Sequence, residues 1–239
     1  MRTLYGINQS PWTERARWAL DHHGVTYRYR EHVPLVGELV LRLRTNVPKP
    51  SVPLLVDGKT KTMGSFDIAR RAEEIGRGST LFPRGKEDVV ARWNDVAESL
   101  SSVGRAWLFR NLRGSHDAQR EALPGFIPGP LRGIAARTSL LGAAWLERKY
   151  RVAADVDAEV TQILRPALED VRAALAGKAY LLDGFTYADL VIAASLQVVR
   201  PHEGAPLGPA TRAAWTNEAL ANEFDDLLMW RDAVYRKHR

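Results

Sequence analysis

Two short segments near the N-terminus carry residue types that could do chemistry. One is Ser10-Pro11-Trp12-Thr13, directly after a predicted strand, and the other is Ser51-Val52-Pro53, directly before another. A serine on a strand-to-helix turn, with proline at the first helical position, has its hydroxyl beside free backbone donors and the positive end of the helix dipole. This environment favours a bound thiolate, so Ser10 is a candidate for activating a thiol.

The elements that must position these segments can be predicted from periodicity. Polar and apolar side chains alternate along residues 2–7, as they do in a half-buried strand. Residues 11–22 have apolar side chains at helical spacing, and Gly24 ends the predicted helix. A proline that opens a strand is a poor ladder residue and suits a tight turn. We therefore expect the Val52–Pro53 peptide bond to be cis.

Strand and helix signals alternate through the first eighty residues. Further strands are predicted at 25–31, 53–56 and 59–63, the last two around an Asp-Gly hairpin, and helices at 39–43 and 66–75. The order β-α-β-α-β-β-α is that of a thioredoxin-like α/β layer. We place this domain at residues 1–78 and a linker at 79–86, where Gly, Ser, Pro and charged residues gather.

No strand signal follows the linker, so residues 87–239 are predicted to form an all-α domain. Helical spacing is present at 87–110, 133–150, 155–177, 186–200 and 223–236. Residues 112–133 are too rich in Gly, Pro and charge to be one helix. Thr186 and Asp189 form a capping box, and Phe185 with Leu190 forms a hydrophobic staple, so this motif is expected to stabilise a helix and not to bind substrate.

Composition excludes several classes of protein. The chain of 239 residues contains no cysteine, which rules out disulfides and thiolate metal sites, and no metal site is predicted elsewhere. No apolar run could span a bilayer, and the N-terminus lacks a signal peptide, so we expect a cytoplasmic protein without membrane association. The net charge of +6 is scattered, which argues against nucleic-acid binding and is compatible with an electropositive cleft for an anionic ligand.

Several motifs together resemble a known family. The segment from Ser10 to Leu20 resembles the first helix of the cytosolic glutathione transferases that have a serine at the active site, and 51–58 resembles the segment with their cis proline. Two further motifs of the family are similar to segments of this chain. One is Gly64-Ser65 with the helix that follows it, and the other is the capping box at 181–190. The resemblance covers most of residues 3–195 and implies a thioredoxin-like domain followed by an all-helical one.

The resemblance implies a role for each site residue. Ser10 would donate a hydrogen bond to the sulfur of glutathione, the co-substrate, and Trp12 would belong to the core or to a wall of the cleft, without taking part in the chemistry. The backbone of Val52 would bind the cysteinyl part of glutathione, and Pro53 would fix the turn. Ser65 would bind a carboxylate together with the helix N–H groups. Helix capping by Ser10 or Ser65, and an ordinary trans proline, remain the structural alternatives.

One position departs from the family pattern. The residue before Ser65 is usually an acid that binds the glutathione ammonium, and here it is Gly64. We expect Asp67 to point elsewhere, and Asp95 or Glu98 of a partner subunit to be the possible substitutes. Binding of glutathione should therefore be weaker than is usual in the family.

Two functions follow from these residues. The first is a glutathione transferase that attacks an electrophilic small molecule, whose pocket Trp107, Phe109 and Trp145 could line. The alternative is a non-catalytic binding or scaffold protein that retains the fold. The resemblance implies a homodimer, and Arg15 is expected to form a surface ion pair.

Overall fold

The first part of the chain folds into a mixed four-stranded sheet. The computed structural model describes residues 1–125, 127–152 and 154–239. The strands are β1 (Thr3–Gly6), β2 (Arg28–Glu31), β3 (Leu54–Asp57) and β4 (Thr60–Met63), in the spatial order β2-β1-β3-β4. Strand β1 runs parallel to β2 and antiparallel to β3, and β3 pairs with β4 in a hairpin. The predicted thioredoxin-like order is confirmed.

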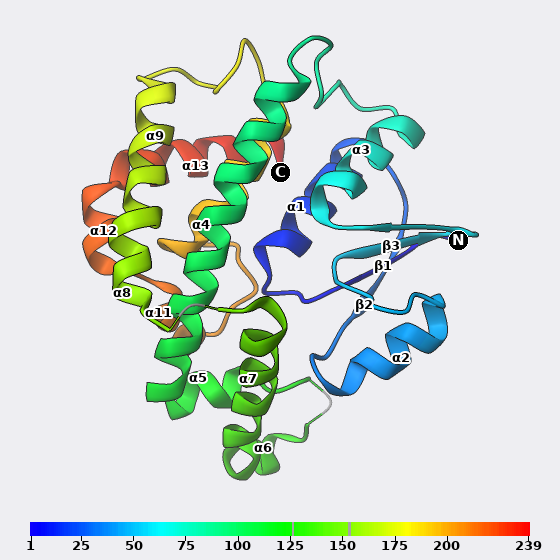
Figure 1. Cartoon of the computed structure of the whole chain (residues 1–239), viewed down its shortest axis with the longest axis vertical. Coiled ribbons are helices and arrows are strands. Elements are labelled where there is room, and N and C mark those ends of the chain that lie inside the picture. The colour runs from blue at the N-terminus through cyan, green and yellow to red at the C-terminus, as the bar shows by residue number, and fades with distance from the viewer. Residues whose placement is uncertain (126, 153) are drawn as a thin grey trace.

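Three helices flank this sheet. They are α1 (Pro11–His22), α2 (Val36–Thr45) and α3 (Ser65–Ile75); in Figure 1, α1 and α3 lie above the strands and α2 lies below them. The second strand is shorter than predicted, because the Val25 N–H closes the end of α1 by donating to the Leu20 carbonyl, 2.9 Å away. Helix α2 is longer than predicted and ends at Asn46, which adopts the left-handed conformation with φ 53°.

The rest of the chain is helical. Its helices are α4 (Glu87–Gly114), α5 (His116–Glu121), α6 (Gly129–Ala135), α7 (Ser139–Tyr150), α8 (Val156–Glu159), α9 (Arg165–Leu175), α10 (Tyr187–Ser195), α11 (Pro209–Trp215), α12 (Glu218–Glu223) and α13 (Asp225–His238). A π-helical turn, Val160–Leu164, joins α8 to α9 just before Pro166, which lacks the N–H that an α-helical bond needs. Across the described ranges no strand follows Met63, and no helix has the length and apolar character to cross a bilayer.

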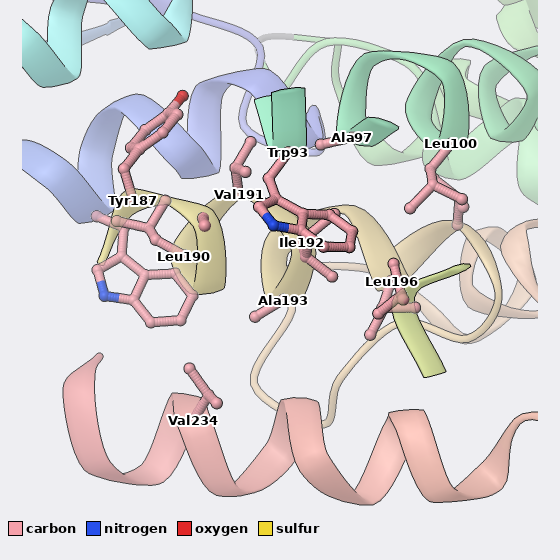
Figure 2. Packing of buried hydrophobic residues seen from close by; sticks show 14 of the residues in the cluster. Trp93, Ala97, Leu100, Tyr187, Leu190, Val191, Ile192, Ala193, Leu196 and Val234 are labelled. Atoms are coloured by element: carbon pink, nitrogen blue, oxygen red, sulfur yellow. The ribbon is translucent and has the colours of Figure 1, made fainter. Parts of the chain in front are cut away.

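The core is continuous between the two parts of the chain. Every residue of α10 is buried, and this helix packs between α4 and α13, as Figure 2 shows for Trp93, Ile192 and Val234. The predicted capping box starts α10: the Asp189 carboxylate accepts from the Thr186 N–H at 2.9 Å and also from the Leu181 N–H at 2.7 Å. The motif therefore has the structural role that the sequence indicated.

Candidate functional site

The six residues proposed for the site come together in one cleft. This cleft has a volume of about 1190 Å³ and lies between the sheet domain and helices α4 and α7. Its lining includes Ser10, Trp12, Val52, Pro53, Gly64 and Ser65. The two segments that the sequence singled out therefore face the same space.

A rigid turn positions Ser10. Its N–H donates to the Ile7 carbonyl at 2.9 Å, and its carbonyl accepts the first hydrogen bond of α1, from the Glu14 N–H at 3.0 Å. The Gln197 side chain, from the helical domain, donates to the Gln9 carbonyl at 3.0 Å and supports the turn from behind. The Ser10 hydroxyl makes no capping hydrogen bond to the helix, so the capping alternative does not account for this residue.

Thr13, one helical turn after Ser10, is unavailable to a ligand. Its side chain is fully buried, and its hydroxyl accepts from the Ile7 N–H at 3.1 Å. It packs on Gly6, where an added Cβ would lie 2.5 Å from the Thr13 Cγ2 atom. Ser10 is thus the hydroxyl of this turn that reaches the cleft.

The Val52–Pro53 peptide bond is cis, as predicted. The Pro53 carbonyl accepts from the Gly64 N–H at 3.0 Å, which joins the cis-proline turn to the start of α3. Among the hydrogen bonds of the described residues, none uses the N–H or the carbonyl of Val52. Both groups of Val52 can therefore pair with an extended ligand in the cleft.

The N-terminus of α3 forms another wall of the cleft. The hydrogen bonds of this helix begin with the Ile68 N–H donating to the Gly64 carbonyl at 3.1 Å, so the N–H groups of Ser65, Phe66 and Asp67 have no acceptor within the helix. These three residues line the cleft. The positive end of the helix dipole and its free donors suit an anionic group here.

Gly64 adopts a backbone conformation that favours glycine. Its φ is 85° and its ψ is 145°, a region that residues with a side chain rarely adopt, although no atom lies within 4 Å of an added Cβ. An acid at this position would be limited by backbone strain and not by space.

Arg15 is not the surface residue that we expected. Its side chain is completely buried and donates to the Ala97 carbonyl at 2.9 Å, to Ser195 Oγ at 2.7 Å and to Ser101 Oγ. It also pairs with the Glu98 carboxylate at 2.5 Å. The same carboxylate accepts from the Trp12 indole N–H at 2.7 Å. This network fixes α1 against α4 and α10.

Three acids were considered for the glutathione ammonium. Within its own chain, Glu98 is held by Trp12 and Arg15, and Asp95 is exposed outside the cleft. Asp67 is among the residues that line the cleft, as is Ser65. Asn94 also lines it, and its buried Oδ1 has no hydrogen-bond partner among the described residues.

Helix α7 contributes residues that the sequence did not reveal. The Tyr150 hydroxyl lies 3.2 Å from Ser51 Oγ, next to the cis-proline turn. Lys149 Nζ donates to the Pro50 carbonyl at 3.1 Å and to the Glu38 carboxylate at 3.0 Å. No pattern in the sequence links α7 with these loops, because the contact joins segments about a hundred residues apart.

The predicted wall for the electrophile is partly correct. Phe109 and Trp145 line the cleft together with Leu108, Leu112 and Leu146, whereas Trp107 lies outside the lining and packs under Arg110. The sequence did not show which face of α4 Trp107 and Phe109 each occupy. Within the described ranges, no group of three or more His, Asp or Glu side chains is arranged to hold a metal ion.

Comparisons with known proteins agree with this fold. Residues 4–80 match the family model described as "Glutathione S-transferase, N-terminal domain". A glutathione S-transferase domain-containing protein from Marinobacter aquaeolei has a similar structure, with 20% identity, a TM-score of 0.63, and coverage of 97% of this chain and 96% of that one. No curated protein matches the sequence.

Two further solved structures are similar over nearly the whole chain. A β-etherase from Sphingobium gives a TM-score of 0.62 at 16% identity, covering 98% of this chain and 94% of that one. A glutathione S-transferase from Methylobacillus flagellatus, solved with GSH bound, gives 0.58 at 14% identity over the same shares. This chain therefore has the fold of the glutathione S-transferase family, with a thioredoxin-like N-terminal domain that matches the N-terminal domain of that family and an all-helical C-terminal domain.

Proposed function

We propose that the protein is a glutathione transferase in which Ser10 activates the glutathione thiol. The observation that carries the proposal is that Ser10 lines the cleft at the start of α1 and that its hydroxyl makes no capping bond. Serine does not ionise near neutral pH, so Ser10 acts as a hydrogen-bond donor to the sulfur. Together with the dipole of α1, this donor lowers the pKa of the thiol and raises the thiolate population.

The reaction is a nucleophilic displacement or addition. The glutathione thiol loses its proton to solvent, and the thiolate sulfur forms a bond to an electrophilic carbon of the second substrate. In a displacement, the leaving group departs with the electron pair of its bond to that carbon. The Ser10 hydrogen bond holds the sulfur in its ionised form until the new bond forms.

The remaining contacts with glutathione follow from groups that face the cleft. The Val52 N–H and carbonyl pair with the cysteinyl backbone, and Ser65 with the first N–H groups of α3 binds the γ-glutamyl carboxylate. For the ammonium, Asp67 takes the place of the acid missing at Gly64, and Asn94 offers its unpaired carbonyl oxygen. These acceptors belong to the same chain, so this proposal replaces the partner-subunit acids considered earlier.

A non-catalytic scaffold is the competing function, and Gly64 is the observation that favours it. The ammonium group of glutathione loses water on entering the cleft, and no acid at position 64 is present to bind it. The free energy of binding is then weaker by about 1.5–3 kcal/mol, the contribution of one charge-assisted hydrogen bond. Tight binding of glutathione by the parent protein, measured by calorimetry, would remove this objection. Asp67→Asn then tests whether Asp67 supplies the missing charge.

Retention on immobilised glutathione and turnover of chlorodinitrobenzene test the proposed function. Ser10→Ala should lower turnover about ten- to a hundredfold, because a hydrogen bond to a charged group contributes about 1.5–3 kcal/mol. Ser99→Ala is the matched control, since Ser99 lines the same cleft but its hydroxyl donates to the Asp95 carbonyl. If the parent protein neither binds glutathione nor turns over the halide, the scaffold function is preferred.

We also propose a homodimer in which the first domain of one subunit packs on the first helices of the second domain of its partner. Met63 on β4 and Val89 on α4 are large apolar side chains that stay 39% and 40% exposed in the single chain, and they are suited to such an interface. Sedimentation equilibrium at micromolar concentration measures the assembly. A mass equal to that of one chain would contradict the dimer.

A further inference from the structure

Arg105 occupies an unusual place in the cleft. It projects from α4, and its guanidinium lies between two aromatic rings, with Cζ 4.8 Å from the centre of the Trp12 ring and 4.4 Å from that of Tyr150. Arg105 and Trp12 line the same cleft as Ser10, so the cation shares the space proposed for the substrates. Stacking of this kind holds an arginine side chain in a fixed direction.

No acid neutralises this arginine within the part of the chain that the structure describes. Arg105 forms no salt bridge, its Nε atom is buried without a hydrogen-bond partner, and its contact with Ser102 Oγ is long at 3.5 Å. Glu98 is the nearby carboxylate, but Arg15 and Trp12 already use it. Burial lowers the pKa of Arg105, so the charged form is poorly solvated.

The charge of Arg105 is therefore available to a ligand. The side chain is half-buried, a cation that has lost part of its water is stabilised by an anion, and arginine presents a planar fork that fits a carboxylate. The cleft that Arg105 lines also has many apolar side chains, including Leu108, Phe109, Leu112 and Leu146. A flat apolar ligand with one anionic end matches both features.

We infer that Arg105 binds an anionic group of the electrophilic substrate, which is an aromatic molecule bearing a carboxylate or a comparable anion. This inference rests on the proposed function and specifies its substrate class. Arg105 would anchor the acidic end, while the ring of the substrate lies along the apolar side of the cleft. The carboxylate of the glycyl end of glutathione is the other anion that could reach the cleft, so the test separates the two sources.

The experiment measures binding and turnover separately. Calorimetry compares nitrobenzoate with nitrobenzamide, which differ in charge and little in shape, in the presence of glutathione. The parent protein should prefer the acid by about ten- to a hundredfold. Arg105→Gln should remove that preference, and Arg105→Lys should retain part of it. Arg110→Gln, on the same helix but outside the cleft, should leave it unchanged.

The possible outcomes are distinct. Equal affinity of the parent protein for the acid and the amide, or an unchanged preference in Arg105→Gln, would overturn the inference. A loss of glutathione affinity in Arg105→Gln, without loss of the preference for nitrobenzoate, would assign the residue to glutathione instead. Turnover of the neutral chlorodinitrobenzene tests the proposed function independently, so its failure would not be confused with failure at Arg105.

Discussion

Replacing Arg15 with methionine tests the network that fixes the first helix. Methionine fills much of the same volume, but it removes the four hydrogen bonds that join α1 to Glu98, Ala97, Ser101 and Ser195. Because Ala97, Ser101 and Ser195 are completely buried, water cannot replace the bonds that they lose. The substitution therefore separates the effect of the charge and hydrogen bonds from that of packing.

The magnitude follows from what remains after the substitution. Breaking a buried ion pair costs about 3–5 kcal/mol, because the remaining charge loses its partner. Here the Glu98 side chain is 44% exposed and keeps its bond from Trp12, so water relieves part of the cost. The Ser195 hydroxyl keeps a bond to the Val191 carbonyl. We expect a loss near the lower limit, about 3 kcal/mol, a large part of the 5–15 kcal/mol typical of a domain.

Urea denaturation of Arg15→Met measures this loss, with the slope m unchanged if the native fold is retained. Arg120→Met is the matched control, because Arg120 is 53% exposed and pairs with Asp117 at 3.9 Å. The control should lose no more than about 1 kcal/mol. If the two variants lose the same free energy, the Arg15 network does not hold α1 in place and our reasoning is wrong.

Three further predictions concern pH, capping and the backbone. Burial lowers the pKa of His202 to about 4, so the unfolded chain binds its proton more readily. The free energy of unfolding should fall by up to about 3 kcal/mol as the pH drops from about 6.5 to 4. In His202→Asn this free energy, measured by urea denaturation at several pH values, should depend less on pH over the same range. Asp189→Ala should cost about 2–4 kcal/mol in urea unfolding, because two N–H groups lose their acceptor; a loss under 1 kcal/mol would refute the capping role. Gly64→Asp should lower the melting temperature, because a φ of 85° costs a side-chain-bearing residue about 1–3 kcal/mol; an unchanged melt with tighter glutathione binding would instead support a simple missing acid.

The sequence predicted the features that local patterns determine. The order of strands and helices in the first domain, the cis bond before Pro53 and the capping box at Asp189 each depend on neighbouring residues. Turn chemistry and periodicity report on such features directly. Short helices such as α5 and α12 were missed, because each is only six residues long and has too few turns to show an apolar stripe.

The features that the sequence did not predict depend on tertiary contacts. Arg15 reads as a surface residue in an amphipathic helix, and only the approach of α4 and α10 buries it. Arg105 of α4 meets Trp12 of α1 and Tyr150 of α7, which are on separate helices.

The most direct test of the proposed function is the pKa of the glutathione thiol bound to the protein. Ultraviolet absorbance of the thiolate, titrated with pH under saturating glutathione, measures it for the parent protein, Ser10→Ala and the control Ser99→Ala. A hydrogen bond worth about 1.5–3 kcal/mol corresponds to a shift of about one to two pKa units. We expect the thiol pKa to be lowered in the parent protein and in Ser99→Ala, and to rise by that amount in Ser10→Ala. The same thiol pKa in Ser10→Ala as in the parent protein, with glutathione bound to both, would contradict the role of Ser10.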